Sequence, residues 1–300
     1  MTTQRRRRRR RPSSEKPQQP LHNPRGIQER ILVFGVEGTG KSEAWISIAV
    51  AAQESGSEAH FYVIDTDGSA AVSLLSHPKL DNVSIWQASD PDGYLLTPDG
   101  GETDYSSWWE AWSEAARQIR AKRPGRDDWI IVDRLDRMWD AVQSWWIEKA
   151  YGEDENAYWA ELRAEQVKAK KESGKGTDRD YGGFQGNRDW VQIKKVYNKA
   201  VLGLLAGPPC HKLAVCLEKD IFPGGKAAQL RGLYGETMPA GKGDQGADFW
   251  LTVQLKRSPG GDHLVFVRRT KDRGFENPGA VDITDVGFAE GFLKDVWGWR

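Results

Sequence analysis

Residues 35–42 read GVEGTGKS, that is Gly35, Val36, Glu37, Gly38, Thr39, Gly40, Lys41 and Ser42. The apolar stretch directly before them predicts a strand at 31–34, and apolar residues at helical spacing predict a helix from Ser42 to about Gln53. Glycines at these positions let the backbone curl so that its N–H groups face a phosphate. Lys41 can reach the β- and γ-phosphates of a nucleotide, and the Ser42 hydroxyl can bind Mg²⁺. The stretch therefore predicts a loop that binds ATP and Mg²⁺, with a chance glycine-rich turn as the alternative.

Length and composition indicate a soluble globular protein with one main domain. A chain of 300 residues can bury one sizeable core, and no stretch approaches the roughly 18 consecutive apolar residues of a membrane helix. Its two cysteines, Cys210 and Cys216, lie in a segment that reads as core, which favours neither a disulfide framework nor a zinc site. This cysteine usage fits a reducing cytoplasm. Most of the tryptophans recur at helical spacing, so we expect them to pack in the core.

The net charge of zero hides a division along the chain. Residues 1–30 carry ten Lys or Arg and two acidic residues, a charge of +8, so residues 31–300 carry −8. Seven consecutive arginines, Arg5–Arg11, open a segment rich in Pro, Ser and Gln, and we expect 1–30 to be a disordered tail. An arginine run binds phosphate backbones by releasing counterions, which makes nucleic acid the expected partner. The alternatives are a solubilising tail and an attraction to the acidic body of the protein.

Apolar strands alternate with helical stripes through the rest of the chain. Further strands are expected at 61–64, 129–132 and 213–217, with helical stripes at 108–119, 135–146 and 190–204. This alternation predicts an α/β fold in which helices flank both faces of a mostly parallel, twisted sheet. A β-hairpin is expected from 249–255 and 263–267, which flank Ser-Pro-Gly-Gly, and a short helix at 288–297. A flexible insertion at about 151–189 and a glycine-rich loop at about 218–246 interrupt the pattern.

Two acidic residues follow predicted strands and are candidates for the chemistry. Asp133 is assigned to hold Mg²⁺ through water, and capping of the next helix is the alternative. Its neighbour, Arg134, is not an acid, so a general base must come from elsewhere. Asp67 is expected to orient the attacking water if its strand lies beside the strand that leads into the phosphate loop. A surface turn that begins at Asp65 is the competing interpretation.

With these motifs, residues 31–285 resemble the RecA-like ATPases, particularly the RadA, KaiC and phage recombinase branch. In that family a catalytic acid sits in a D-x-E sequence after the second strand, and Asp65-Thr66-Asp67 resembles it with Asp in place of Glu. The resemblance implies a RecA-like core, ATP hydrolysis with Mg²⁺, and action on nucleic acid, with single-stranded DNA expected, in recombination or replication. It also implies a homo-oligomer, as a ring or filament, and a cytoplasmic location, which is the host cytoplasm if the chain is virus-encoded.

The C-terminal hairpin resembles a second element of the same family. There a hairpin ends in a K-x-R element, written KNRFG in RadA, which completes the active site of the neighbouring subunit. Here the second strand of the hairpin runs into Lys271-Asp272-Arg273-Gly274-Phe275. The resemblance implies that Lys271 and Arg273 act in trans, both on one side of an extended strand, and neutralise charge on the transferred phosphoryl group. A solvated strand end is the alternative.

Two loops fall where that family places its DNA-binding loops. They combine glycines with cations and aromatic residues, which suits single strands, although active-site lids have the same composition. The first loop offers Lys175, Arg179, Tyr181, Phe184 and Arg188, and the second offers Lys219, Lys226, Arg231, Tyr234 and Lys242. Glu218, just before the second loop, resembles a sensor position of the family.

Two other function classes share the phosphate loop. A small-molecule or nucleotide kinase would use the glycine-rich loops as lids, and the K-x-R hairpin disfavours it. A nucleotide-dependent assembly or packaging adaptor is favoured if Asp67 fails as a base. The LSGGQ signature of ABC ATPases and the NKxD signature of GTPases are absent from the sequence.

Overall fold

The computed structural model describes residues 22–88, 105–152, 161, 164, 168 and 186–300. Its centre is a nine-stranded sheet with the order β3-β2-β4-β5-β1-β7-β8-β9, and β6 pairs with β5. The strands are β1 (Arg30–Gly35), β2 (Phe61–Asp65), β3 (Val83–Gln87), β4 (Trp129–Asp133), β5 (His211–Asp220), β6 (Thr237–Pro239), β7 (Leu251–Arg257), β8 (His263–Thr270) and β9 (Ala280–Asp282). The run from β3 to β7 is parallel, whereas β6, β8 and β9 are antiparallel to their neighbours. The predicted α/β fold with a mostly parallel sheet is confirmed.

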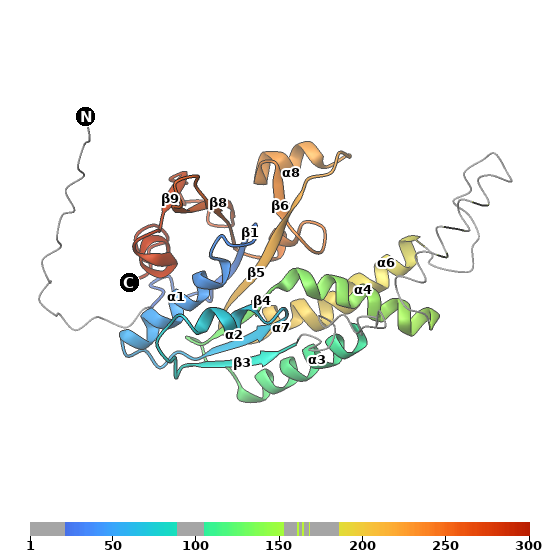
Figure 1. Cartoon of the computed structure of the whole chain (residues 1–300), viewed down its shortest axis with the longest axis horizontal. Coiled ribbons are helices and arrows are strands. Elements are labelled where there is room, and N and C mark those ends of the chain that lie inside the picture. Colours follow the sequence, from blue (N-terminus) through green and yellow to red (C-terminus); the bar gives the residue numbers. More distant parts are fainter. Residues whose placement is uncertain (1–21, 89–104, 153–160, 162–163, 165–167, 169–185) are drawn as a thin grey trace, which may run out of the picture.

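Helices cover both faces of this sheet (Figure 1). One face carries α1 (Lys41–Glu54), α2 (Ser69–Leu74) and the π-helix η3 (Ala289–Lys294). The other carries α3 (Tyr105–Lys122), α4 (Leu135–Tyr151), α6 (Gly186–Tyr197), the π-helix η1 (Asn198–Leu202) and α7 (Gly203–Ala206). Alternate side chains of a strand point to opposite faces, so Ile31 and Val33 of β1 join the first core while Leu32 and Phe34 join the second.

The helical stripes read from the sequence form these cores. Trp45 of α1 and Trp112 of α3 are fully buried, as are Met138 and Val142 of α4. Burying one such large apolar side chain contributes about 1.5–3 kcal/mol. The expectation that tryptophans pack in the core is confirmed for these helices.

The segment 218–246 was wrongly expected to be a glycine-rich loop. Strand β5 continues to Asp220, and α8 (Ala227–Tyr234), β6 and the 3-10 helix η2 (Gln245–Asp248) follow it. Pairing of β6 with the end of β5 satisfies the backbone groups of this extension. The edge strands β3 and β9 were also missed, because neither has a buried apolar run.

Residues 22–30 were assigned to the disordered tail, but the structure packs them against the C-terminal end. His22 and Arg300 exchange two backbone hydrogen bonds of 2.9 and 3.1 Å. The buried carboxylate of Glu29 accepts hydrogen bonds from Asn23 Nδ2 at 2.7 Å and from Trp297 Nε1 at 3.0 Å. This part of the predicted tail is therefore anchored to the domain.

Several other expectations concern residues outside the described part of the chain. They include the run Arg5–Arg11, the remainder of 1–21, and most of the insertion expected at 151–189. Within the described residues, Cys210 and Cys216 are buried and free, and no helix is long and apolar enough to span a membrane.

Gly35 is the point at which the phosphate-loop strand meets β7. A Cβ atom there would lie 2.4 Å from Leu255 O and 2.8 Å from Thr39 Oγ1, and a backbone carbonyl in a sheet cannot move aside cheaply. We expect Gly35→Ala to lower the free energy of unfolding by about 1–3 kcal/mol. Urea denaturation measures the change. The control Gly225→Ala adds a Cβ in open space and should leave the stability near that of the unmodified protein; equal stability of the two variants would contradict the prediction.

Candidate functional site

A pocket of about 480 Å³ lies at the carboxyl edge of the parallel strands. Parallel strands place their carboxyl ends at one edge, so loops that are distant in the sequence meet there. The residues that line the pocket are Glu37, Gly38, Gly40, Lys41, Ser42, Glu43, Asp67, Ser69, Ser73, Asp133, Arg134, Leu217 and His263. The structure thus brings together most of the phosphate loop and both acidic candidates.

The three other residues of the loop, Gly35, Val36 and Thr39, do not line the pocket. The carbonyl of Val36 accepts hydrogen bonds from Thr39 Oγ1 at 2.9 Å and from Lys41 Nζ at 2.6 Å. Gly38 and Gly40 have φ angles of +73° and +84°, which residues with a Cβ rarely adopt. The backbone of the loop therefore curves around the side chain of Lys41.

Helix α1 starts directly from this loop at Lys41, and no side chain caps its N-terminus. The N–H groups of a first helical turn have no partner within the helix, and the helix dipole adds partial positive charge there. An uncapped N-terminus at the floor of a pocket suits an anion.

Asp133, the last residue of β4, is 1 % exposed. Trp45 Nε1 of α1 donates a hydrogen bond of 2.9 Å to Asp133 Oδ2. Burial raises the pKa of Asp133 to about 6, and hydrogen bonding from Trp45 and Ser42 opposes the rise. The other oxygen, Oδ1, is buried without a hydrogen bond of normal geometry among the described residues.

These two residues fit a magnesium ion. Asp133 offers a buried carboxylate oxygen that needs a partner, and Ser42 offers a hydroxyl in the same pocket. Mg²⁺ prefers oxygen ligands and takes few of them from protein, because phosphates and water complete its shell. Among the described residues, no group of three or more His, Cys, Asp or Glu could hold a metal ion.

Two cations face the pocket, Lys41 and Arg134. Lys41 is 8 % exposed, and its burial lowers its pKa. Repulsion from the charge of Arg134 lowers the pKa of Lys41 further, while attraction to Asp133 opposes the change. Glu37, Glu43, Asp67 and Asp133 line the same cavity, so the side chains of Lys41 and Arg134 are the positive charges that it offers to an anion.

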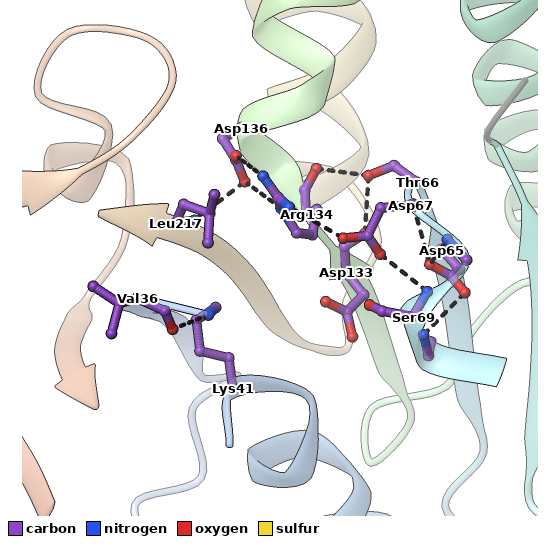
Figure 2. A network of polar contacts seen from close by, with 12 residues as sticks. Val36, Lys41, Asp65, Thr66, Asp67, Ser69, Asp133, Arg134, Asp136 and Leu217 are labelled. Carbon is purple, nitrogen blue, oxygen red and sulfur yellow. Dashed lines mark hydrogen bonds and ion pairs between the residues drawn. The ribbon is translucent and has the colours of Figure 1, made fainter. Parts of the chain in front are cut away.

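Arg134 lies between the carboxylates of Asp67 and Asp136 (Figure 2). Its Nη1 is 3.2 Å from Asp67 Oδ2, and its Nη2 is 2.8 Å from Asp136 Oδ2. The backbone of Arg134 is left-handed, with φ 76° and ψ 68°, a conformation that costs of order 1–3 kcal/mol for a residue with a side chain. Thr66 Oγ1 contacts the carbonyls of Asp133 and Arg134 at 3.0 and 2.8 Å and holds this turn in place.

Asp67 reaches the pocket by a route that the sequence did not predict. Its role was predicted on the condition that its strand lies beside β1, and this condition is not met, because β4 and β5 separate β2 from β1. Asp65 begins a turn in which its oxygens accept hydrogen bonds from Gly68 N at 2.9 Å and Ala70 N at 3.1 Å. Asp65 therefore caps α2. The turn that these hydrogen bonds stabilise places Asp67 at the pocket.

His263 lines the pocket and was not predicted. It begins β8, and its Nδ1 lies 3.3 Å from the carbonyl oxygen of Thr39. One of the two parallel neighbours of β1 is β7, and antiparallel β8 begins beside the end of β7, next to the phosphate loop. Only the strand order brings this histidine to the pocket, so no local sequence signal reveals it.

Lys271 and Arg273 lie at the opposite edge of the sheet. Thr270, the last residue of β8, pairs with Leu251, the first residue of β7, whereas the phosphate loop follows the far end of β1. The eight residues of β8 span roughly 24 Å at 3.4 Å per residue. The strand ends before Lys271, so the expectation of two cations on one extended strand is wrong: both are exposed in the turn after it.

The second predicted nucleic-acid loop is largely folded into the domain. Tyr234, expected as a stacking residue, is 1 % exposed and donates a hydrogen bond of 2.7 Å to Asp244 Oδ1. Lys219 Nζ donates to Gly241 O at 2.6 Å, and Lys242 contacts Asp248 at 3.3 Å. These three side chains are occupied within the protein.

The remaining candidates of these loops divide into two groups. Three of them are exposed. Lys226 lies at the start of α8, Arg231 lies within α8, and Arg188 lies in α6. Glu218 does not line the pocket and instead accepts a hydrogen bond of 2.8 Å from Gln254 Nε2. The others, Lys175, Arg179, Tyr181 and Phe184, lie outside the described residues.

The raised pKa of Asp133 predicts how the magnesium-free protein responds to pH. The folded value of about 6 lies above the ordinary 3.8, so the charged form costs stability above pH 6, and this cost disappears below about pH 4. We expect Asp133→Asn to raise the free energy of unfolding at pH 8 by at most about 3 kcal/mol. The gain should shrink to nothing as the pH falls to 4.

Urea denaturation in EDTA at several pH values measures this difference. The control Asp81→Asn makes the same change at a side chain that is 76 % exposed, and it should show no comparable gain. A gain for Asp133→Asn that is the same at pH 4 and pH 8 would show that the buried charge is not its cause.

The chain was also compared with known proteins. No protein-family model matches it, and no curated protein matches it.

Proposed function

We propose that this pocket binds ATP with Mg²⁺ and that the chain hydrolyses ATP as a RecA-like ATPase that acts on nucleic acid. The observation that supports the proposal best is the convergence of four features on one cavity: the uncapped start of α1, Lys41, Ser42 and the buried carboxylate of Asp133. A volume of about 480 Å³ falls within the range of small-molecule sites.

Each residue has a distinct part in this proposal. The backbone N–H groups of Gly38 and Gly40 face the phosphates, and Lys41 exchanges the carbonyl of Val36 for phosphate oxygens. Ser42 and Asp133 would hold Mg²⁺, which neutralises phosphate charge when it is bound. Asp67, which also lines the pocket, would orient the attacking water.

Single-stranded nucleic acid is the proposed partner, with single-stranded DNA preferred. The tail Arg5–Arg11 supplies charge for phosphates. In the described part of the chain, Phe222 is 78 % exposed and shares a second pocket, of about 420 Å³, with Lys226. An exposed aromatic ring beside a cation is the combination that stacks on bases and neutralises the backbone.

The phosphate loop predicts the outcome of an ATPase assay. We expect Lys41→Ala to abolish ATP turnover while circular dichroism shows an intact fold, because the variant lacks the cation at the β- and γ-phosphates. Single-stranded DNA should stimulate the unmodified protein. Lys79→Ala, at a lysine that is 89 % exposed, is the matched control and should retain full activity. Unchanged hydrolysis by folded Lys41→Ala would refute the proposal.

Assembly is tested by mixing two inactive variants. If Lys271 and Arg273 act on the nucleotide of a neighbour, Arg273→Ala should lower hydrolysis strongly and leave ATP binding nearly unchanged, because such cations act as charge develops in the transition state. When Arg273→Ala subunits are mixed with Lys41→Ala subunits, part of the activity should return. In such a mixture, one kind of interface pairs an intact phosphate loop with an intact Lys271 and Arg273.

The mixing experiment also separates the proposal from a kinase. Co-sedimentation verifies that the two variants assemble together. No recovery in co-assembled mixtures, together with turnover that is independent of protein concentration, would remove the trans model and favour a monomeric kinase.

A further inference from the structure

Arg134 lines the pocket and has no part in the chemistry proposed so far. It is 11 % exposed, lines the pocket together with Lys41, and holds a left-handed backbone at the start of α4. Among the described residues, the only other non-glycine residue with a positive φ is Arg123, which is exposed. A strained backbone that turns a guanidinium into a phosphate pocket indicates a binding role for this side chain.

The two partners of Arg134 hold it unequally. Asp136 makes two contacts, at 2.8 Å with Nη2 and 3.4 Å with Nε, whereas Asp67 makes a single contact of 3.2 Å with Nη1. Asp136 is itself fixed, because its Oδ1 accepts a hydrogen bond of 3.3 Å from Leu217 N. The guanidinium is thus anchored on one side, and its contact on the pocket side is the weaker one.

We propose that Arg134 recognises the γ-phosphate: when ATP occupies the pocket, its Nη1 leaves Asp67 and binds a γ-phosphate oxygen, while Asp136 keeps the guanidinium in place. This inference rests on the proposed nucleotide site. A guanidinium suits the task because its N–H groups are fixed in a fork that matches carboxylate on one side and phosphate on the other. ADP lacks the γ-phosphate, so in that state the contact with Asp67 persists.

The exchange has a consequence for Asp67. As long as Asp67 accepts a hydrogen bond from Arg134, one of its oxygens is occupied, and the other accepts a hydrogen bond of 3.1 Å from Ser69 N. Release of Arg134 to the γ-phosphate frees the first oxygen at the moment when a water must be oriented. One movement therefore binds the triphosphate and makes its proposed base available.

Arg134 lies among several acidic residues, and one other cation lines the pocket. Asp65, Asp67, Asp133 and Asp136 end or follow β2 and β4, and Lys41 is the other cation that faces the pocket. Cationic side chains stabilise the charge of a phosphoryl group during its transfer. Arg134 is the remaining cation that lines the pocket.

The test compares affinities for Mg-ATP and Mg-ADP by titration calorimetry on the full chain. Arg134→Gly removes the guanidinium and relieves the strain of the left-handed backbone, and circular dichroism verifies that the variant is folded before the titration. We expect its ATP affinity to fall by roughly tenfold to a hundredfold, the value of a charge-assisted hydrogen bond, and its ADP affinity to stay within about twofold. Arg123→Gly, the same change at the other left-handed arginine, should alter neither affinity.

A second variant tests the exchange itself. Asp67→Asn removes the charge that competes for Arg134, so ATP affinity should rise, ADP affinity should stay the same, and turnover should fall by roughly a hundredfold. An equal loss of ATP and ADP affinity in Arg134→Gly would overturn the inference, because it would show that Arg134 only shapes the pocket. If Arg134→Gly binds ATP and ADP with the same affinities as the unmodified protein, the inference is overturned as well. If the unmodified protein binds neither nucleotide, the proposed function itself fails.

Discussion

The ion pairs of Arg134 with Asp67 and Asp136 are the interaction on which the geometry of the pocket depends. Parallel strands bring their carboxyl ends to one edge, and this chain places acidic residues at the ends of both β2 and β4. The guanidinium between Asp67 and Asp136 offsets their repulsion, and Thr66 holds the same turn through the carbonyls of Asp133 and Arg134. Removing one partner of a buried ion pair typically costs 3–5 kcal/mol, because the other charge is left uncompensated. The same contacts that hold the turns together therefore also hold Asp67 near the phosphate loop.

The edge of the sheet stores unfavourable free energy that a ligand can relieve. Asp133 is buried with one oxygen unpaired, Arg134 has a strained backbone, and Lys41 is bound to a carbonyl of its own loop. In the proposed complex with a nucleotide and magnesium, each of these groups would gain a better partner. Strain and unpaired polar groups concentrate at binding sites for this reason, and stability is supplied by the two apolar cores elsewhere.

The parts of this arrangement that follow from local chemistry could be predicted from the sequence. Three features are each encoded within about 15 residues. They are the glycines and Lys41 of the loop, the apolar strand before it, and the apolar face of the following helix, which includes Trp45. The positions of His263 and Asp67 could not be predicted, because they depend on which strands are neighbours. In the sequence, Arg134 was noted only because it stands where a second acidic residue could have followed Asp133. Its pairing with Asp136 depends on the turn that Thr66 holds in place.

The C-terminal hairpin joins the two edges of the sheet, and this limits what its cations can do. His263 begins β8 beside the phosphate loop, and Lys271 follows its other end, roughly 24 Å away by strand geometry. A lysine or arginine side chain cannot cover that distance, so Lys271 and Arg273 cannot act on the nucleotide of their own chain while the strand stays formed. Either they meet the pocket of another subunit, or they are solvated ends of a strand. In the first case, the pocket of the neighbouring subunit would have to face the edge of the sheet at which Lys271 and Arg273 lie.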